Sequence, residues 1–371
     1  MARILTAGNE LGDWAADGLS AYQGVITSVA NQRFSAISPG NNGGQWSFYL
    51  TSGQGLEYDF EPDHPGGIGE FYFRCHMHMG NRTDGTWERL RFSTSAGALL
   101  LRFATVDGGS GASPGGLWYP AIYNSAGALL LANTTTKFRN SEWNLIELHV
   151  KLDAAVGRVE LWINKFRVFD YTGPLVGGGG EALMYRFRPN YTAMGGGLAN
   201  STYYDDMAIN DLTGTVNNGR VGEGWVVPVR PSGNGSSSQL TNAFGGSVDN
   251  FKFVNKILDL NPSGLVGTST ASDKDLYALQ SMPDEFSGIN VLKGVAYAVR
   301  NGPSITKAKL ILKPTAQAEI DLPSGVGIGV SLPAGSPAYV SSSFETNPNS
   351  SNEPFTKAEL DGMEAGIQFI A

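Results

Sequence analysis

The sequence predicts an all-β protein with two units, an antiparallel sandwich followed by a smaller β-sandwich-like unit with a short C-terminal helix. Three observations support this prediction. Only 16% of the 371 residues are charged and 49 are glycine, a composition typical of short strands joined by many turns. Apolar and polar residues alternate in one short run after another, as in half-buried strands. Glycine and asparagine gather near residue 214, where a domain boundary is expected.

The first unit, residues 1–214, contains frequent strand-like runs bounded by Gly, Asn, Asp or Pro. Asn164 and Lys165 separate two alternating runs and predict a tight hairpin turn. The segment Ser-Ala-Gly-Ala-Leu-Leu-Leu occurs at 95–101 and again at 125–131, which predicts two similar hairpins. The strands expected in this unit are 44–50, 69–79, 87–94, 98–106, 144–153, 157–171 and 203–211.

A second β domain is expected over residues 222–371, with a linker and its first strand at 215–235. Near the C-terminus, Thr356 and Glu359 have the spacing of a capping box, and apolar residues follow at helical spacing, which predicts a short helix ending around Gly366. The strands expected in this domain are 224–231, 248–254, 274–280, 289–301, 307–314 and 334–347.

Charge and cysteine content exclude several classes of protein. The formal net charge is −8 and no stretch concentrates Lys or Arg, so nucleic-acid binding is not expected. Cys75 is the single cysteine, so no intrachain disulfide can form. The N-terminus lacks the apolar core of a signal peptide, and no run approaches membrane-spanning length. We therefore expect a protein made in the cytoplasm that does not insert into a membrane.

Three segments of the first unit resemble the laminin-G-like, concanavalin A-type jelly-roll family. Residues 141–150 and 157–168 are similar to the central strands of that family, where a Trp opens one strand and a short hairpin follows. Residues 200–214 resemble its closing strand, and residues 10–14 its opening strand. The resemblance implies a jelly roll over about residues 8–214.

The two-unit organisation resembles structural proteins of tailed bacteriophages, in which a jelly roll precedes a compact β domain. Residues 345–367 resemble the C-terminal segment of that architecture, with Phe355 where Trp is common and Met363 where Leu is common. The resemblance implies a virion protein made in the host cytoplasm and without enzymatic activity. Its partners would be other virion proteins and copies of itself, with a trimer as one natural arrangement.

The sequence leaves open where in a virion such a protein would lie. We expect first a component of the tail adsorption apparatus, in the tail tip, baseplate or fibre, whose jelly-roll loops face a host-surface glycan. A capsid decoration or head-spike protein is the alternative.

An acidic segment supplies a second alternative, a glycoside hydrolase. Glu57, Asp59 and Glu61 alternate with apolar residues, which resembles the active-site strand of laminarinase-type enzymes. A retaining mechanism needs its two carboxyl groups about 5–5.5 Å apart, whereas residues i and i+4 of a flat strand lie roughly 13 Å apart. Pro62 ends the run. These carboxylates are therefore weak catalytic candidates, and a strand with a solvated acidic face is expected.

A structural calcium ion is a further candidate, although no cofactor is required. The first and last strands of the resembled jelly rolls are neighbours, so Glu10 could share a Ca²⁺ ion with Asp205 and Asp206. The alternative is that one aspartate is solvated and the other caps a turn.

His76 and His78 lie two residues apart and would share one face of a strand, while Cys75 would face the other way. A surface or core-edge pair is therefore expected rather than a zinc site.

Glycan binding needs aromatic platforms beside planar polar groups. Trp118, Tyr119, Tyr123 and Tyr191 lie in segments that also contain Gly and Asn, and they are the candidates. The alternative is that these aromatic residues fill the core of the sandwich.

Overall fold

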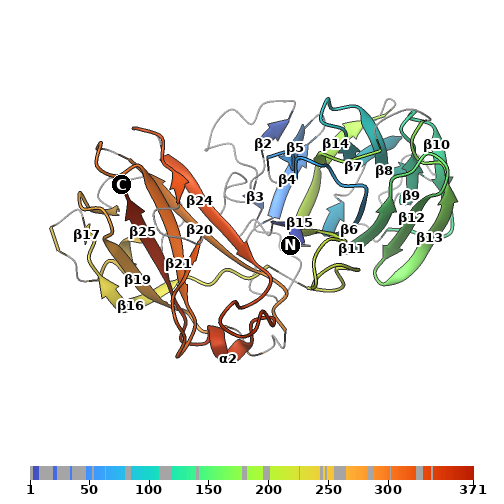
Figure 1. Ribbon diagram of the computed structural model, residues 1–371. Helices are drawn as coiled ribbons and strands as arrows, with labels where there is room; N and C mark the ends of the chain where they lie inside the picture. Colours follow the sequence, from blue (N-terminus) through green and yellow to red (C-terminus); the bar gives the residue numbers. More distant parts are fainter. Residues whose placement is uncertain are drawn as a thin grey trace. The chain divides into compact units, whose positions relative to one another are not determined.

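The computed structural model divides into two compact units, residues 1–227 and 228–371 (Figure 1). No helix among the described residues is long and apolar enough to cross a membrane. The structure describes residues 3–7, 20–22, 34–35, 47–51, 54–62, 64–79, 85–107, 118–138, 142–177, 182–194, 201–224, 226–242, 245–246, 249–254, 265–282, 284, 288–300, 302–322, 329–335 and 337–371.

The first unit is a jelly-roll sandwich of two antiparallel sheets, as the sequence predicts. The eight-stranded sheet has the order β13 (Phe166–Gly173), β12 (Gly157–Ile163), β11 (Trp143–Lys151), β6 (Glu70–Met79), β15 (Ser201–Asp211), β4 (Ser47–Thr51) and β3 (Phe34–Ser35), and β1 (Arg3–Ala7) also pairs with β15. The seven-stranded sheet has the order β10 (Leu129–Ala132), β9 (Trp118–Tyr123), β8 (Leu99–Asp107), β7 (Thr86–Ser93), β14 (Arg186–Ala193), β5 (Gln54–Asp59) and β2 (Ser20–Tyr22).

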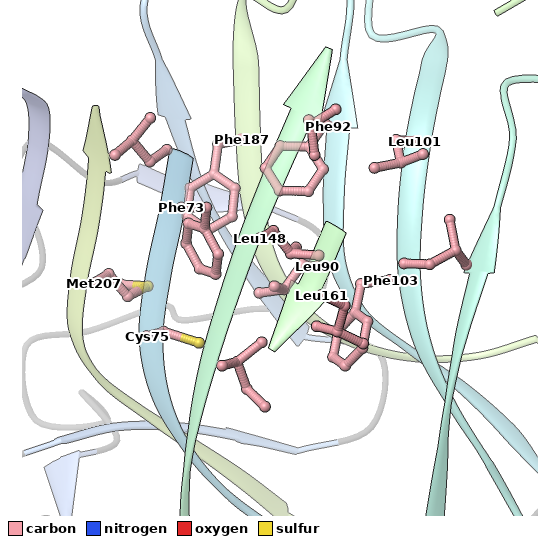
Figure 2. Packing of buried hydrophobic residues seen from close by; sticks show 14 of the residues in the cluster. Phe73, Cys75, Leu90, Phe92, Leu101, Phe103, Leu148, Leu161, Phe187 and Met207 are labelled. Atoms are coloured by element: carbon pink, nitrogen blue, oxygen red, sulfur yellow. The ribbon is translucent and has the colours of Figure 1, made fainter. Parts of the chain in front are cut away.

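The facing sides of these two sheets form one continuous hydrophobic core. Phe73 and Leu148 of the eight-stranded sheet lie close to Phe92 and Phe187 of the seven-stranded sheet (Figure 2). The rings of Phe73 and Phe187 are 5.0 Å apart between centroids. Since side chains alternate between the two faces of a strand, the residues flanking these core positions must point away from the core. Each sheet therefore has an outer face whose composition the core does not determine.

The predicted hairpins are confirmed. Asn164 and Lys165 both have positive φ, at 50° and 73°, in the two-residue turn between β12 and β13. The two repeated segments form the turns between β7 and β8 and between β9 and β10. Their glycines, Gly97 and Gly127, have φ of 80° and 74°, a conformation that a side chain disfavours.

The second unit is built around a six-stranded antiparallel sheet, and a two-stranded ribbon of β20 (Leu292–Val299) and β24 (Pro337–Phe344) packs on it through a small apolar cluster. A further pair of short strands is β17 (Thr241–Asn242) with β18 (Val266–Gly267). The order of the sheet is β16 (Pro231–Ser238), β19 (Lys274–Leu279), β25 (Glu364–Ile370), β21 (Lys307–Lys313) and β22 (Ile320–Leu322), with β23 (Val330–Ser331) also paired with β21.

Two strand predictions at the start of the second domain are wrong. Of the predicted strand 224–231, residues 224 and 226–230 form no strand, and Pro231 begins the Gly/Ser-rich strand β16. Residues 251–254 form the one-turn helix α1 (Phe251–Val254) instead of part of a strand. Strand β16 forms because it pairs with β19, so tertiary pairing overrides its weak strand propensity.

The C-terminal helix is real but shorter than predicted. The capping box between Thr356 and Glu359 is present, and it opens the single-turn helix α2 (Lys357–Leu360). The chain then enters β25, a strand between β19 and β21, so the predicted end near Gly366 is wrong. A Cβ atom on Gly366 would lie 1.8 Å from the carbonyl oxygen of Asp275, so this close strand pairing requires glycine.

Candidate functional site

Part of the outer face of the eight-stranded sheet is covered by residues 215–224 and 226–227, which we call the covering segment. Arg220 forms a two-point ion pair with Glu147 of β11, and the backbone N–H of Gly222 donates to the same carboxylate at 3.0 Å. The Arg220 guanidinium also lies 4.5 Å from the ring centroid of Trp162. Glu147 is buried in consequence. Residues 215–235 were expected as a linker and the first strand of the next domain, but the covering segment belongs to the first unit.

Two further contacts hold the covering segment. Asp206 accepts a hydrogen bond from the Val226 N–H at 2.7 Å, and Arg74 donates to the carbonyl oxygen of Gly222 at 3.4 Å. Burial lowers the pKa of Arg74, and the nearby carboxylates Asp206 and Glu147 oppose that shift. Arg74, Glu147 and Asp206 on this face are thus bonded to the covering segment.

His149 lies on the same outer face between two carboxylates. Its Nδ1 is 2.7 Å from Glu160 and its Nε2 is 2.8 Å from Glu70. The ring stacks on Tyr72 with centroids 4.3 Å apart. Burial and the charge of Glu70 raise the pKa of Tyr72. This cluster resembles a structural network, because both ring nitrogens of His149 already have a carboxylate partner within the sheet.

The outer face of the seven-stranded sheet carries a row of arginines on adjacent strands. Arg188 of β14 is directly opposite Arg91 of β7, and Arg91 is directly opposite Arg102 of β8. Arg102 is in turn opposite Tyr123 of β9, whose ring centroid lies 5.9 Å from the guanidinium. We call Arg188, Arg91 and Arg102 the arginine row. Arg186 lies on β14 two residues from Arg188 and therefore shares this face.

Carboxylates partly neutralise the row. Arg188 is ion-paired with Glu57 of β5, and Arg102 is ion-paired with Glu88 of β7. Glu88, although on the outer face, is only 4% exposed at its side chain. The Arg188 pair is a charge-assisted hydrogen bond, whereas the Nε of Arg102 lies close to Glu88 without hydrogen-bond geometry.

Arg91 and Arg186 are less fully engaged. Arg91 lies 3.7 Å from Glu88, and Arg186 lies 3.8 Å from Glu57 and 3.7 Å from Asp59, all longer than a hydrogen bond. Within the described part of the chain neither guanidinium donates a hydrogen bond, and the Nε atoms of both are buried without a partner. Their side chains remain 25% and 28% exposed. The exposed part of each of these two side chains is therefore what the face offers to a ligand.

The acidic segment is placed differently from its prediction. Glu57 and Asp59 lie on the outer face of β5 beside Arg186, so this face is ion-paired rather than simply solvated. Glu61 lies beyond the end of the strand, where its N–H donates to Asp59 at 3.0 Å and its side chain is exposed. Phe60 is buried and the chain turns at Pro62, so Glu61 does not lie on the same face as Glu57 and Asp59.

The four aromatic glycan candidates separate into different environments. Trp118 is buried in the core, so its prediction as an exposed platform is wrong. Tyr119 and Tyr123 are half-buried on the outer face of β9. Tyr191 lies on β14, and its side chain is outside the described residues.

The calcium candidates have partners within the chain. Asp205 and Asp206 are buried, and Asp206 contacts His76 at 3.0 Å and Val226 at 2.7 Å. Asp205 accepts a hydrogen bond from the Asp206 N–H at 2.8 Å. Glu10 is outside the described residues. No cluster of three metal-ligating side chains occurs in the described ranges.

The histidine pair lies where expected, at the edge of the core. His76 and His78 share the outer face of β6, and Cys75 is buried on the other face. His78 packs edge-on against Trp143 and Tyr203.

Sequence reasoning missed the arginine row, yet the sequence contains a signal for it. Arg91, Arg102 and Arg188 each stand between two apolar residues of a strand, in Leu-Arg-Phe, Leu-Arg-Phe and Phe-Arg-Pro. Alternation places each one opposite the core. Only strand order shows that β14, β7 and β8 are neighbours, so that the three positions align.

Comparison with family models and with curated proteins gave no match. Solved structures with a similar fold include the alginate lyase Aly36B, at 14% identity and a TM-score of 0.41 over 57% of this chain and 96% of the other. The CBM2 module of the evolved Dit of Lactobacillus casei BL23 phage J-1 has 11% identity and a TM-score of 0.35, covering 56% and 95%.

A third similar structure, of botulinum neurotoxin type C, has 8% identity and a TM-score of 0.36, covering 100% of this chain and 98% of the other. These values are too low to assign a family or to carry an activity or a ligand over to this chain.

Proposed function

We propose that this protein is a virion structural protein of a tailed bacteriophage, a component of the tail adsorption apparatus, whose jelly-roll unit binds a host-surface glycan without cleaving it. The observation that supports glycan binding is the outer face of the seven-stranded sheet, where the arginine row ends at Tyr123. The virion assignment depends on the resemblance of the two-unit organisation and of residues 345–367 to phage structural proteins.

The chemistry of this face suits a sugar. Planar guanidinium groups present several N–H donors in a fixed fork, which matches pairs of oxygen atoms. Tyr119 and Tyr123 add ring surfaces of the kind that pack against sugar rings. Glu57 and Glu88 are held in ion pairs with arginines, an arrangement that favours binding over hydrolysis.

Glycan binding is tested with the full-length protein and purified cell-surface polysaccharide of the host, by calorimetry. Tyr123→Ala is expected to weaken binding about threefold to tenfold, because it removes one aromatic platform. Tyr297→Ala, in the second unit, is the matched control and is expected to bind like the wild type. Absence of binding by the wild-type protein would overturn the proposal, and release of reducing ends would show a glycan-cleaving enzyme instead.

The virion assignment is tested separately by cryo-electron microscopy of the intact particle. Copies around the tail axis would support an adsorption role. Copies on icosahedral axes would replace it with a capsid decoration role, and absence from the particle would overturn the virion assignment.

A further inference from the structure

We propose that the ligand of the arginine row is an anionic glycan, one whose units carry carboxylate or phosphate groups. This inference rests on the proposed function and adds the charge of the ligand to it. It follows from the balance of charge, the geometry and the partly exposed arginines on one sheet face.

The balance of charge on this face is opposite in sign to that of the chain. The whole sequence has a formal net charge of −8, yet among the described residues of this face the arginines outnumber the carboxylates that contact them. Four guanidinium groups meet three carboxylates: Arg91, Arg102, Arg186 and Arg188 against Glu57, Asp59 and Glu88. A local cationic excess on an acidic protein concentrates anions at that site.

The geometry places like charges side by side. Directly opposite residues on neighbouring strands have Cβ atoms about 4.5–5.5 Å apart, and like charges at that spacing destabilise a sheet. Glu57 relieves this repulsion at the Arg188 end, and Glu88 relieves it at the Arg102 end. Arg91, in the middle, is left with a carboxylate at 3.7 Å that Arg102 also uses. An anion beside Arg91 would remove the remaining repulsion, which a neutral hydroxyl cannot do.

The partly exposed arginines point to the same ligand class. The side chains of Arg91 and Arg186 are 25% and 28% exposed, and their carboxylate contacts among the described residues are no shorter than 3.7 Å. A guanidinium attracts an anionic oxygen by its full charge as well as by hydrogen bonding, and with carboxylate or phosphate it can form two parallel hydrogen bonds. Partial burial lowers the local dielectric constant and increases this attraction. Arg91 and Arg186 are therefore the residues that we expect to distinguish a charged glycan from a neutral one.

The test compares three probes by calorimetry with the full-length protein: polygalacturonate, its fully methyl-esterified form, and a glycerol phosphate oligomer. We expect at least one charged probe to bind ten times or more tightly than the methyl ester, with the affinity falling as salt rises. Preference for polygalacturonate would identify carboxylate as the group recognised, and preference for the glycerol phosphate oligomer would identify phosphate.

Arg91→Gln is expected to weaken binding of the charged probe about tenfold or more, because it removes charge-assisted donors. The matched control is Arg167→Gln, which removes an exposed arginine, paired with Asp170, from the other sheet and leaves affinity unchanged. Glu88→Gln is a second variant, expected to change affinity in the opposite direction. Loss of this carboxylate leaves Arg91 and Arg102 free for the ligand and should tighten binding several-fold.

Equal affinity for charged and neutral probes would overturn the anionic ligand and leave glycan binding intact. Binding to none of the probes or host polysaccharides would overturn the proposed function itself. An Arg91→Gln protein that stays folded by circular dichroism and binds the charged probe as the wild type does would also contradict the inference.

Discussion

The two outer faces of the jelly roll carry similar residues but use them differently. On the eight-stranded sheet, Glu147 and Asp206 are bonded to the covering segment, and the charged groups contribute to folding. On the seven-stranded sheet, Arg91 and Arg186 reach a carboxylate only at 3.7 Å or more. The difference shows that burial of charge on a sheet face does not by itself mark a site. A charged group that lacks full hydrogen bonding and lies beside a group of the same charge is better evidence of a binding site.

Removing one arginine from each face should give the largest contrast. Arg220→Ala leaves the buried Glu147 carboxylate without its cation, so we expect the free energy of unfolding to fall by about 2–4 kcal/mol. Arg186→Ala removes a side chain that makes no hydrogen bond in the described part of the chain, so we expect a change of about 0.5 kcal/mol or less. Urea unfolding followed by tryptophan fluorescence reports on the first unit, because all seven tryptophans lie within residues 1–227.

Equal losses in the two variants would contradict the difference between the faces. A loss of glycan affinity in Arg220→Ala as large as in Arg186→Ala would also contradict it.

Neutralising the buried carboxylate should cost less than removing its cation. Glu147→Gln keeps an oxygen that can accept from the Gly222 N–H and leaves Arg220, which is 40% exposed, able to turn toward water. We expect a loss of about 1–2 kcal/mol in the free energy of unfolding. Glu223→Gln is the control, since its exposed pair with Lys165 should contribute about 0.5 kcal/mol or less. A larger loss for Glu147→Gln than for Arg220→Ala would show that hydrogen bonding to the backbone, not charge, holds the covering segment.

Glu359 in the second unit is a carboxylate whose two oxygens are both hydrogen-bonded within the protein, and it can be compared with the carboxylates of the sheet faces. One oxygen accepts from Gln317, Asn347 and Ser350, and the other accepts from the backbone N–H and the hydroxyl of Thr356. The hydrogen bond from the Thr356 N–H is the main cause that lowers the pKa of Glu359 to about 2. Because the folded-state pKa is depressed, the carboxylate stabilises the fold above the unfolded value of 4.5, and this stabilisation is lost as the pH falls toward 2.

Glu359→Gln should therefore lower the unfolding free energy by about 1 kcal/mol at pH 7, and the difference from the wild type should shrink below pH 4.5. Circular dichroism detects this transition, while tryptophan fluorescence of the first unit should not change. A difference that is constant from pH 7 to pH 2.5 would show that the carboxylate charge is not involved.

The sequence alone determined the fold class, most strands of the first unit and the local turns. The alternation of residues, the Asn164-Lys165 turn and the Thr356–Glu359 capping box depend only on residues close in sequence. They can therefore be predicted from the sequence alone. Strand β16 was missed because it forms by pairing with β19, which is distant in sequence. Helix α1 has only four residues, too few to show a helical period.

Tertiary structure decided the candidate site. Arg91, Arg102 and Arg188 become neighbours only because β14, β7 and β8 are adjacent in one sheet, and strand order depends on long-range pairing that composition and periodicity do not encode. The same is true of the covering segment: its glycines and asparagines suggest a linker, and only the position of Glu147 and Asp206 on a sheet face makes it part of the first unit.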